Sequence, residues 1–310
     1  MSLLIVGSMA FDAIETPFGK TDKIIGGAGT YICYSASYFV DQSYAVSVVG
    51  GDFPKATLKD LNDRGVNTDG VEVKENEQSF FWSGKYHNDM NSRDTLVTEL
   101  NVLEHFEPKV PDAARTTDYV MLGNLSPDVQ RDVINQMSER PKLIALDTMN
   151  FWMDIALDSL KETLKLIDLL IINDEEARQL SGEYSLLKAA QAIRKMGPKY
   201  LIIKKGEHGA LLFFEDKVFF APALPLEEVF DPTGAGDVFA GGVMGYLAKA
   251  DDLSFAAFKR SIIYGSAMAS FCVEKFGTEN LEKLSDEAIQ TRATAFLNLV
   301  QVEFDALTSL

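Results

Sequence analysis

The stretch Asp231-Pro232-Thr233-Gly234-Ala235-Gly236-Asp237 lies in the C-terminal part of the chain and runs directly into the apolar segment 238–244. A Gly-Ala-Gly turn that opens a helix directs several backbone N–H groups and the positive end of the helix dipole at one point. Such a point binds anions, and phosphate in particular. The Asp237 carboxylate is then either a helix cap or a group that accepts a proton from an attacking hydroxyl. These seven consecutive residues therefore indicate phosphoryl transfer.

Upstream of this stretch, short apolar runs recur and predict the strands of a sheet. The runs are 3–7, 44–50, 119–123, 143–147, 169–173 and 200–204. Continuously apolar runs, unlike alternating ones, are typical of parallel strands covered on both faces. Amphipathic stretches between them predict helices, as at 185–196, and small residues predict a helix over 263–276. Residues 211–220 predict a hairpin at one sheet edge. The pattern is typical of an α/β fold with a doubly wound, mostly parallel sheet.

Ligands of such sheets bind outside the carboxyl ends of the strands, which makes Asp147 and Asn173 site candidates by position. Two stretches, approximately 11–25 and 78–100, interrupt the strand–helix alternation and are rich in turn formers and aromatic residues. We expect them to form a small inserted β lid over the strand ends. The sequence has no internal repeat, low-complexity tract or linker, so we expect a single domain over residues 1–310.

The composition narrows the class of partner. The 310 residues carry a net charge of −17, which argues against a nucleic-acid partner because phosphate backbones require a basic surface. A phosphate site in so acidic a chain must be made locally positive by backbone dipoles, a few lysines and metal. Cys33 and Cys272 are the two cysteines, and their separation favours a reducing compartment. No apolar run reaches membrane-spanning length and no signal peptide is evident. We expect a cytoplasmic protein that does not associate with membranes.

The chain resembles the ribokinase-like (PfkB) carbohydrate and nucleoside kinases over most of its length, and the stretch 231–237 matches their Asp-x-Thr-Gly-Ala-Gly-Asp motif. The resemblance implies the three-layer ribokinase-like fold, with ATP as phosphoryl donor. It implies that Asp237 is the catalytic base and that Gly234, Ala235 and Gly236 form the anion hole. It also implies that Thr233 lies at the nucleotide and that Asp231 helps to bind a monovalent cation such as K⁺.

Two N-terminal segments resemble the parts of the family that bind the phosphoryl acceptor. Gly26-Gly27-Ala28-Gly29-Thr30-Tyr31 resembles the glycine-rich helix start of the family, and Asp12 stands where the family binds substrate hydroxyls. A carboxylate accepts two hydroxyl hydrogen bonds, which suits a vicinal diol. Tyr31 replaces the usual Asn, so either a binding or a packing role is open for it.

Two segments at the ends of predicted strands resemble the parts of the family that bind the nucleotide. Asn173 and Glu176 match the Asn-x-x-Glu element, which implies that they organise Mg²⁺ and phosphate, with Glu176 acting on the metal through water. A capped acidic helix start explains the same residues, and both roles are compatible. Lys205, Gly206 and Gly209 resemble the family's glycine loop under the nucleotide.

The sequence thus predicts an ATP-dependent kinase that phosphorylates a hydroxyl of a sugar or ribose-containing small molecule. A nucleoside kinase, a free-sugar kinase and a non-catalytic sugar- or nucleotide-binding regulator all remain open. An oxidoreductase is disfavoured because the first strand is not followed by G-x-G-x-x-G. The lid aromatics Phe81, Trp82 and Tyr86 either face a substrate ring or make a homodimer contact through the lid.

Overall fold

The structure is a computed structural model and describes residues 1–301. Within these residues, a large nine-stranded sheet has the order β14-β13-β12-β11-β10-β9-β1-β5-β6. Its strands are β1 (Leu3–Val6), β5 (Ser43–Gly50), β6 (Val66–Lys74), β9 (Tyr119–Leu122), β10 (Leu143–Asp147), β11 (Leu169–Asn173), β12 (Tyr200–Lys204), β13 (Ala210–Phe214) and β14 (Lys217–Ala221). The pairings from β6 to β12 are parallel, and β13 and β14 add an antiparallel hairpin at one edge. The predicted sheet and edge hairpin are confirmed.

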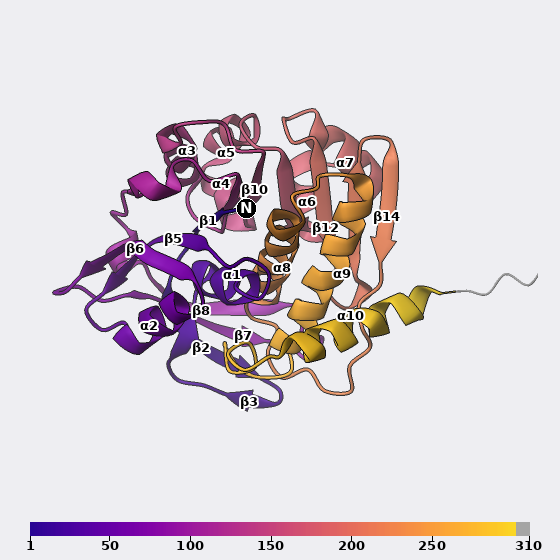
Figure 1. Cartoon of the computed structure of the whole chain (residues 1–310). Helices are drawn as coiled ribbons and strands as arrows, with labels where there is room; N and C mark the ends of the chain where they lie inside the picture. Colours follow the sequence, from indigo (N-terminus) through magenta and orange to yellow (C-terminus); the bar gives the residue numbers. More distant parts are fainter. Residues whose placement is uncertain (302–310) are drawn as a thin grey trace, which may run out of the picture.

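Helices cover both faces of this sheet, which makes three layers (Figure 1). They are α1 (Ala28–Ala36), α2 (Lys55–Asp63), α3 (Pro127–Gln136), α4 (Asn150–Ile155), α5 (Leu157–Leu164), α6 (Asp174–Ser181), α7 (Leu186–Arg194), α8 (Ala235–Ala250), α9 (Phe255–Cys272) and α10 (Asp286–Val300). Alternate strand residues supply the two cores. Leu3 and Ile5 pack with α1, α8 and α9, whereas Leu4 and Val6 pack with α3, α5 and α7. None of the helices within residues 1–301 is long and apolar enough to cross a membrane.

Two elements differ from the sequence predictions. Strand β6 was not predicted, because as an edge strand it buries little more than Val66 and Val71 and is otherwise polar. The helix expected over 263–276 instead runs from Phe255 to Cys272. The side chain of Ser254 caps its start by accepting from the Ala257 N–H. At its end, the Phe271 carbonyl accepts from the Asn280 amide, and the carbonyl of the C-cap residue Val273 accepts from the Phe230 N–H instead of continuing the helix.

A smaller sheet lies against the large one and contains both stretches expected to form the lid. It has the order β3-β2-β7-β8, and β4 pairs with β2. Its strands are β2 (Ala10–Thr16), β3 (Gly19–Lys20), β4 (Ile24–Gly26), β7 (Phe80–Tyr86) and β8 (Arg93–Glu99). The parallel register of β2 and β7 sets Asp12 beside Trp82 and Phe11 beside Phe81. Because side chains alternate along a strand, Asp12, Trp82 and Tyr86 share one face. Phe11 and Phe81 lie on the other face of the small sheet and pack against the core that contains Leu3 and Ile5.

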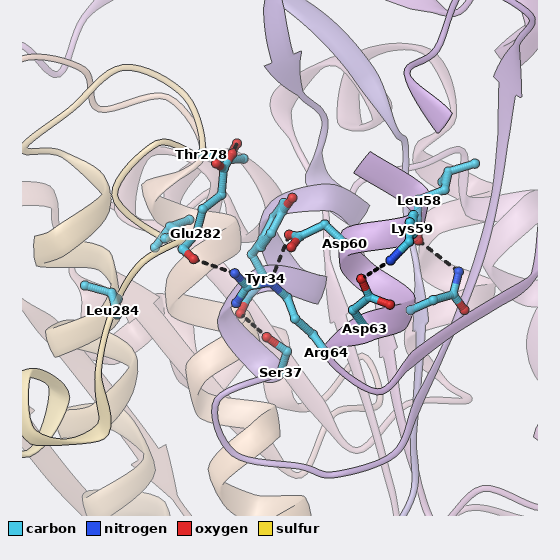
Figure 2. A network of polar contacts seen from close by, with 12 residues as sticks. Tyr34, Ser37, Leu58, Lys59, Asp60, Asp63, Arg64, Thr278, Glu282 and Leu284 are labelled. Atoms are coloured by element: carbon cyan, nitrogen blue, oxygen red, sulfur yellow. Dashed lines mark hydrogen bonds and ion pairs between the residues drawn. The ribbon is translucent and has the colours of Figure 1, made fainter. Parts of the chain in front are cut away.

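A polar network fixes helix α1, whose first turn follows the Gly26-Gly27 pair (Figure 2). Arg64, at the end of α2, donates to Asp60 Oδ2 at 2.9 Å and to the Glu282 carbonyl. Its guanidinium lies 5.2 Å from the ring centre of Tyr34 and 5.7 Å from that of Tyr38, both on or next to α1. The Tyr38 hydroxyl accepts from the Leu284 N–H at 3.1 Å. The network therefore joins α1, α2 and the segment before α10.

Candidate active site

Helix α8 begins within the motif Asp231-Pro232-Thr233-Gly234-Ala235-Gly236-Asp237. Its N-cap, Gly234, has a φ of 75°, and a Cβ there would lie 2.5 Å from the ring of Tyr31. Both the backbone conformation and the close approach therefore require glycine. The N–H groups of Gly236 and Asp237 lie in the first turn, where no preceding helical carbonyl can accept them. The Ala235 N–H is already bound to the Pro232 carbonyl at 3.2 Å. The Asp237 N–H is hydrogen-bonded to the carboxyl of its own residue, so the anion site of this helix start is centred on Gly236.

Asp237 lies in a cluster of ionisable groups drawn from several elements. Burial, followed by the nearby Asp147 carboxylate, raises the pKa of its carboxyl to about 7, while Lys204 and Arg93 oppose the shift. Lys204 Nζ lies 3.3 Å from Asp147 Oδ1. A carboxyl with a pKa near neutrality is matched to accepting a proton at physiological pH.

The loop before α8 is held by its own first and third residues. Asp231 is almost fully buried and accepts from the Thr233 N–H at 2.8 Å and from the Gly277 N–H at 3.1 Å. The Thr233 hydroxyl shares a hydrogen bond of 3.1 Å with the hydroxyl of Tyr86, on strand β7. Asp231 therefore organises the loop, and the small sheet touches it directly.

Asp12 and the paired glycines lie together on the acceptor side. A Cβ at Gly26 would lie 1.9 Å from Asp12 Oδ2, and the Gly27 N–H is hydrogen-bonded to the Asp12 carboxyl. Gly27 has a φ of 90°, and its Cβ would collide with the carbonyl of Ser8 at 2.5 Å. Burial, followed by the carboxylates of Asp231 and Asp237, raises the pKa of Asp12 to about 7. The predicted acceptor carboxylate and the predicted base are therefore close enough to interact.

Tyr31 lies between the acceptor and phosphate sides. The side chain is 1% exposed, and its ring packs under Gly234. Its hydroxyl is buried and has no hydrogen-bond partner within residues 1–301. Burial raises the pKa of this phenol, as do the carboxylates of Asp12, Asp231 and Asp237. The packing role is observed, and the hydroxyl retains its capacity to donate a hydrogen bond.

The Asn-x-x-Glu element forms a reciprocal cap at the start of α6. The Glu176 N–H donates to Asn173 Oδ1, and the Asn173 N–H donates to Glu176 Oε2, both at 2.8 Å. Glu176 is 6% exposed, and burial followed by the Asp147 carboxylate raises its pKa to about 7. A cation near these two carboxylates would relieve their mutual repulsion. No group of three or more metal-binding side chains occurs in the described chain.

The glycine loop predicted to lie under the nucleotide follows β12. Gly206 and Gly209 have φ values of 53° and 87°. Lys205, which directly follows β12 and precedes Gly206, is partly exposed. A Cβ at Gly206 would lie 2.5 Å from Oδ1 of Asn91, in the turn between β7 and β8. The small sheet therefore reaches both this loop and Thr233.

Sequence reasoning missed two basic residues of this cluster. Lys204 ends one of the predicted strands, so the rule that directed attention to Asp147 and Asn173 could have found it. Arg93 opens strand β8 opposite Tyr86, with its guanidinium 5.9 Å from the ring centre of Trp82. It offered no local signal, because only the folding of the small sheet brings it near Asp237.

Comparison with known proteins agrees with this geometry. The pfkB family of carbohydrate kinases matches residues 2–284. A cytidine kinase of Thermococcus kodakarensis is 28% identical over 250 residues, which are 79% of this chain and 87% of that protein. A nucleoside kinase of Methanothermobacter thermautotrophicus is 27% identical over 93% of this chain and 94% of its own. The crystal structure of Methanocaldococcus jannaschii nucleoside kinase superposes with a TM-score of 0.76 at 20% identity, covering 94% and 98% of the two chains.

The fold and the match over residues 2–284 define a ribokinase-type phosphotransferase. The chain belongs to the pfkB family of carbohydrate kinases and is a carbohydrate or nucleoside kinase.

Proposed function

We propose that this protein transfers the γ-phosphoryl group of ATP to a hydroxyl of a ribonucleoside, with Asp237 as general base. The observation that carries the proposal is the position of Asp237. It stands in the first turn of α8, its pKa is raised to about 7, and it interacts with the acceptor-side carboxyl of Asp12. A base with this pKa lies within the first turn of a helix, where unpaired N–H groups stabilise phosphoryl oxygens.

The reaction follows from these positions. Asp12 and the backbone of Gly27 hold hydroxyls of the acceptor, and the attacking hydroxyl gives its proton to the Asp237 carboxylate. Its oxygen forms a bond to the γ-phosphorus while the bond to the β–γ bridging oxygen breaks, and ADP leaves with the electron pair. The amides of Gly234 and Gly236 and the dipole of α8 stabilise the charge on the transferring group.

On the nucleotide side, Lys205, Gly206, Gly209 and Thr233 would bind ATP. Glu176, acting through water, and Asn173 would hold Mg²⁺, which supplies charge neutralisation to the phosphates. A monovalent cation such as K⁺ is proposed beside Asp231, because this buried carboxylate joins the loop that opens α8, at the Thr233 N–H, to the segment after α9, at the Gly277 N–H. Replacing K⁺ by choline in the assay should then lower the turnover rate.

A ribonucleoside acceptor is favoured by the face of the small sheet that carries Asp12. Trp82 lies beside Asp12 in the register, with its ring over Gly84 and its indole N–H bonded to Thr95 at 3.3 Å. An aromatic residue on the same face of the sheet as the Asp12 carboxylate offers a stacking surface to a base attached to a ribose. The relatives from T. kodakarensis and M. thermautotrophicus are named cytidine kinase and nucleoside kinase. A free sugar is the second candidate, since Asp12 and Gly27 serve any diol.

The small sheet is proposed to act as a lid that excludes water, which otherwise competes as acceptor. A homodimer through the lid is also proposed, because Leu96, Val97 and Leu100 leave an apolar patch on and after β8 that is at least 40% exposed at each residue. Light scattering coupled to size exclusion tests the dimer, and substitution of Leu96 and Val97 by Ser should yield monomers.

The activity test measures ADP release by the purified protein with Mg-ATP against ribonucleosides, free sugars and polyols. We expect a ribonucleoside to give the highest kcat/KM. Trp82→Ala should raise KM for that nucleoside roughly tenfold, whereas Trp82→Phe should restore most of the affinity. If the protein phosphorylated free sugars alone, the proposal of a nucleoside acceptor would be refuted and the proposal of kinase activity would stand. ATP binding without turnover of any acceptor would instead favour a nucleotide-binding regulator.

A further inference from the structure

We infer that Lys204 is a catalytic residue whose ammonium group contacts the transferring phosphoryl group from the side of the large sheet. This inference rests on the proposed function and extends it to a residue that the motifs do not include. It depends on three observations: the position of Lys204 at a strand end, the approach of its Nζ atom to the start of α8, and its unused hydrogen-bonding capacity.

Lys204 is the last residue of β12 and pairs in register with Asn173, the last residue of β11. The parallel strands thus bring its side chain to the same sheet edge as the Asn-x-x-Glu element. The side chain is 17% exposed, and Nζ lies 3.3 Å from Asp147 Oδ1 at the end of β10. The lysine therefore lies at the carboxyl ends of three adjacent strands, where ligands of such sheets bind.

The ammonium also reaches the first turn of α8. A Cβ at Gly236 would lie 2.9 Å from Lys204 Nζ. Glycine at this position leaves the space between the ammonium and the first-turn N–H groups open. An anion bound to those N–H groups would contact Nζ as well, so the helix start and the lysine form one site.

The hydrogen bonds of Lys204 leave donors free for a phosphate. An ammonium has three N–H donors. Within residues 1–301, its one hydrogen bond is the contact of 3.3 Å to Asp147, longer than a close charge-assisted bond. A buried ammonium is costly unless it is paired, so unfilled donors beside an anion site indicate an anionic ligand.

The charges around Lys204 keep it in its cationic form. Burial opposes the charged state, but Asp147, Glu176 and Asp237 outweigh it and hold the pKa of the ammonium above its usual value. Arg93 is the other cation whose field reaches Glu176 and Asp237. During transfer, negative charge spreads over the three equatorial oxygens of the phosphoryl group. Lys204 would bind one of these oxygens while the Gly236 amide binds another.

A structural role is the competing explanation, because Lys204 could serve only to neutralise Asp147. Removing one member of a buried pair leaves an uncompensated charge and can unfold the protein, whereas removing both avoids this penalty. We therefore compare Asp147→Asn, Lys204→Met and the double variant Asp147→Asn/Lys204→Met. Lys195→Met, an exposed lysine of the same size at the end of α7, is the matched control.

The first measurement is kcat with the best acceptor, after thermal melting has shown that each variant is folded. A phosphoryl contact predicts that the double variant is roughly 100-fold slower than Asp147→Asn, while Lys195→Met keeps the wild-type rate. A double variant within threefold of Asp147→Asn would overturn the inference.

The second measurement requires no acceptor and separates this inference from the proposed function. Calorimetry compares the affinities for Mg-ADP and for a non-hydrolysable Mg-ATP analogue. Lys204→Met, or the double variant if the single one does not fold, should lose roughly tenfold or more in affinity for the ATP analogue and little for ADP. Equal losses for both nucleotides would overturn the phosphoryl contact. A wild-type protein that binds both nucleotides but phosphorylates nothing would instead refute the proposed function.

Discussion

The clearest consequence of the site is an acid limb in its pH–rate profile. Burial and the Asp147 carboxylate raise the pKa of Asp237 to about 7, against an ordinary value of 3.8. A general base works only when deprotonated, so its active fraction is about 9% at pH 6 and about 90% at pH 8. We therefore expect kcat/KM to rise roughly tenfold between these values. An unperturbed aspartate would give a flat profile over the same range.

The assay is coupled ADP release with the best acceptor from pH 5.5 to 8.5 at constant ionic strength, with kcat/KM reporting the free enzyme. Asp237→Asn should lower kcat by about 10²- to 10⁴-fold and abolish the limb, while the affinity for ATP stays within a few fold. Arg93 holds the pKa of Asp237 down, so Arg93→Met should move the limb to higher pH. If kcat/KM of Asp237→Asn still rises between pH 6 and pH 8, the titrating group is Asp12 or Glu176. A wild-type rate in that variant would refute the base assignment.

Two further predictions use matched controls within the chain. Gly234→Ala should lower kcat at least 100-fold, because it adds a Cβ 2.5 Å from the Tyr31 ring at a φ of 75°. Gly182→Ala has a similar φ of 71° and nothing within 4 Å, so it should destabilise by about 1 kcal/mol and leave kcat unchanged. Arg64→Met removes the Arg64 contacts shown in Figure 2 and should lower the free energy of unfolding in urea by about 2 kcal/mol. Lys59→Met, which breaks the exposed pair with Asp63, should change it by less than about 0.5 kcal/mol.

The large sheet was predictable because its strands are buried on both faces. Runs such as 143–147 and 169–173 are apolar at successive positions, and they became β10 and β11. Strand β6 lacked this signal, since an edge strand needs few apolar residues. The early end of α9 was equally hidden, because it depends on donors from Phe230 and Asn280, distant in the sequence.

The site residues also divide into those that a local motif predicts and those that only the folded sheets bring together. Asp237 and Gly234 stand in a local motif whose geometry follows from a helix start, so their placement could be anticipated. The neighbours of Asp237 could not, because Lys204, Asp147 and Arg93 come from three different strands. Which aromatic residues of the small sheet share a face with Asp12 also depended on the register of β2 and β7. Trp82 shares that face and Phe81 does not, which the sequence left undecided.

The electrostatics of the site explain why a chain of net charge −17 can bind a polyphosphate. Asp12, Glu176 and Asp237 each have a pKa raised to about 7, first of all by burial, so near neutral pH each carboxyl is only partly ionised. Lys204 and Arg93 add fixed positive charge, and the start of α8 adds a partial positive charge. Bound Mg²⁺ would favour the ionised carboxylates, and protons would leave the site as the nucleotide enters. Mg²⁺ entering with the nucleotide, and not the phosphate charge, would thus favour the deprotonated Asp237 that transfer requires.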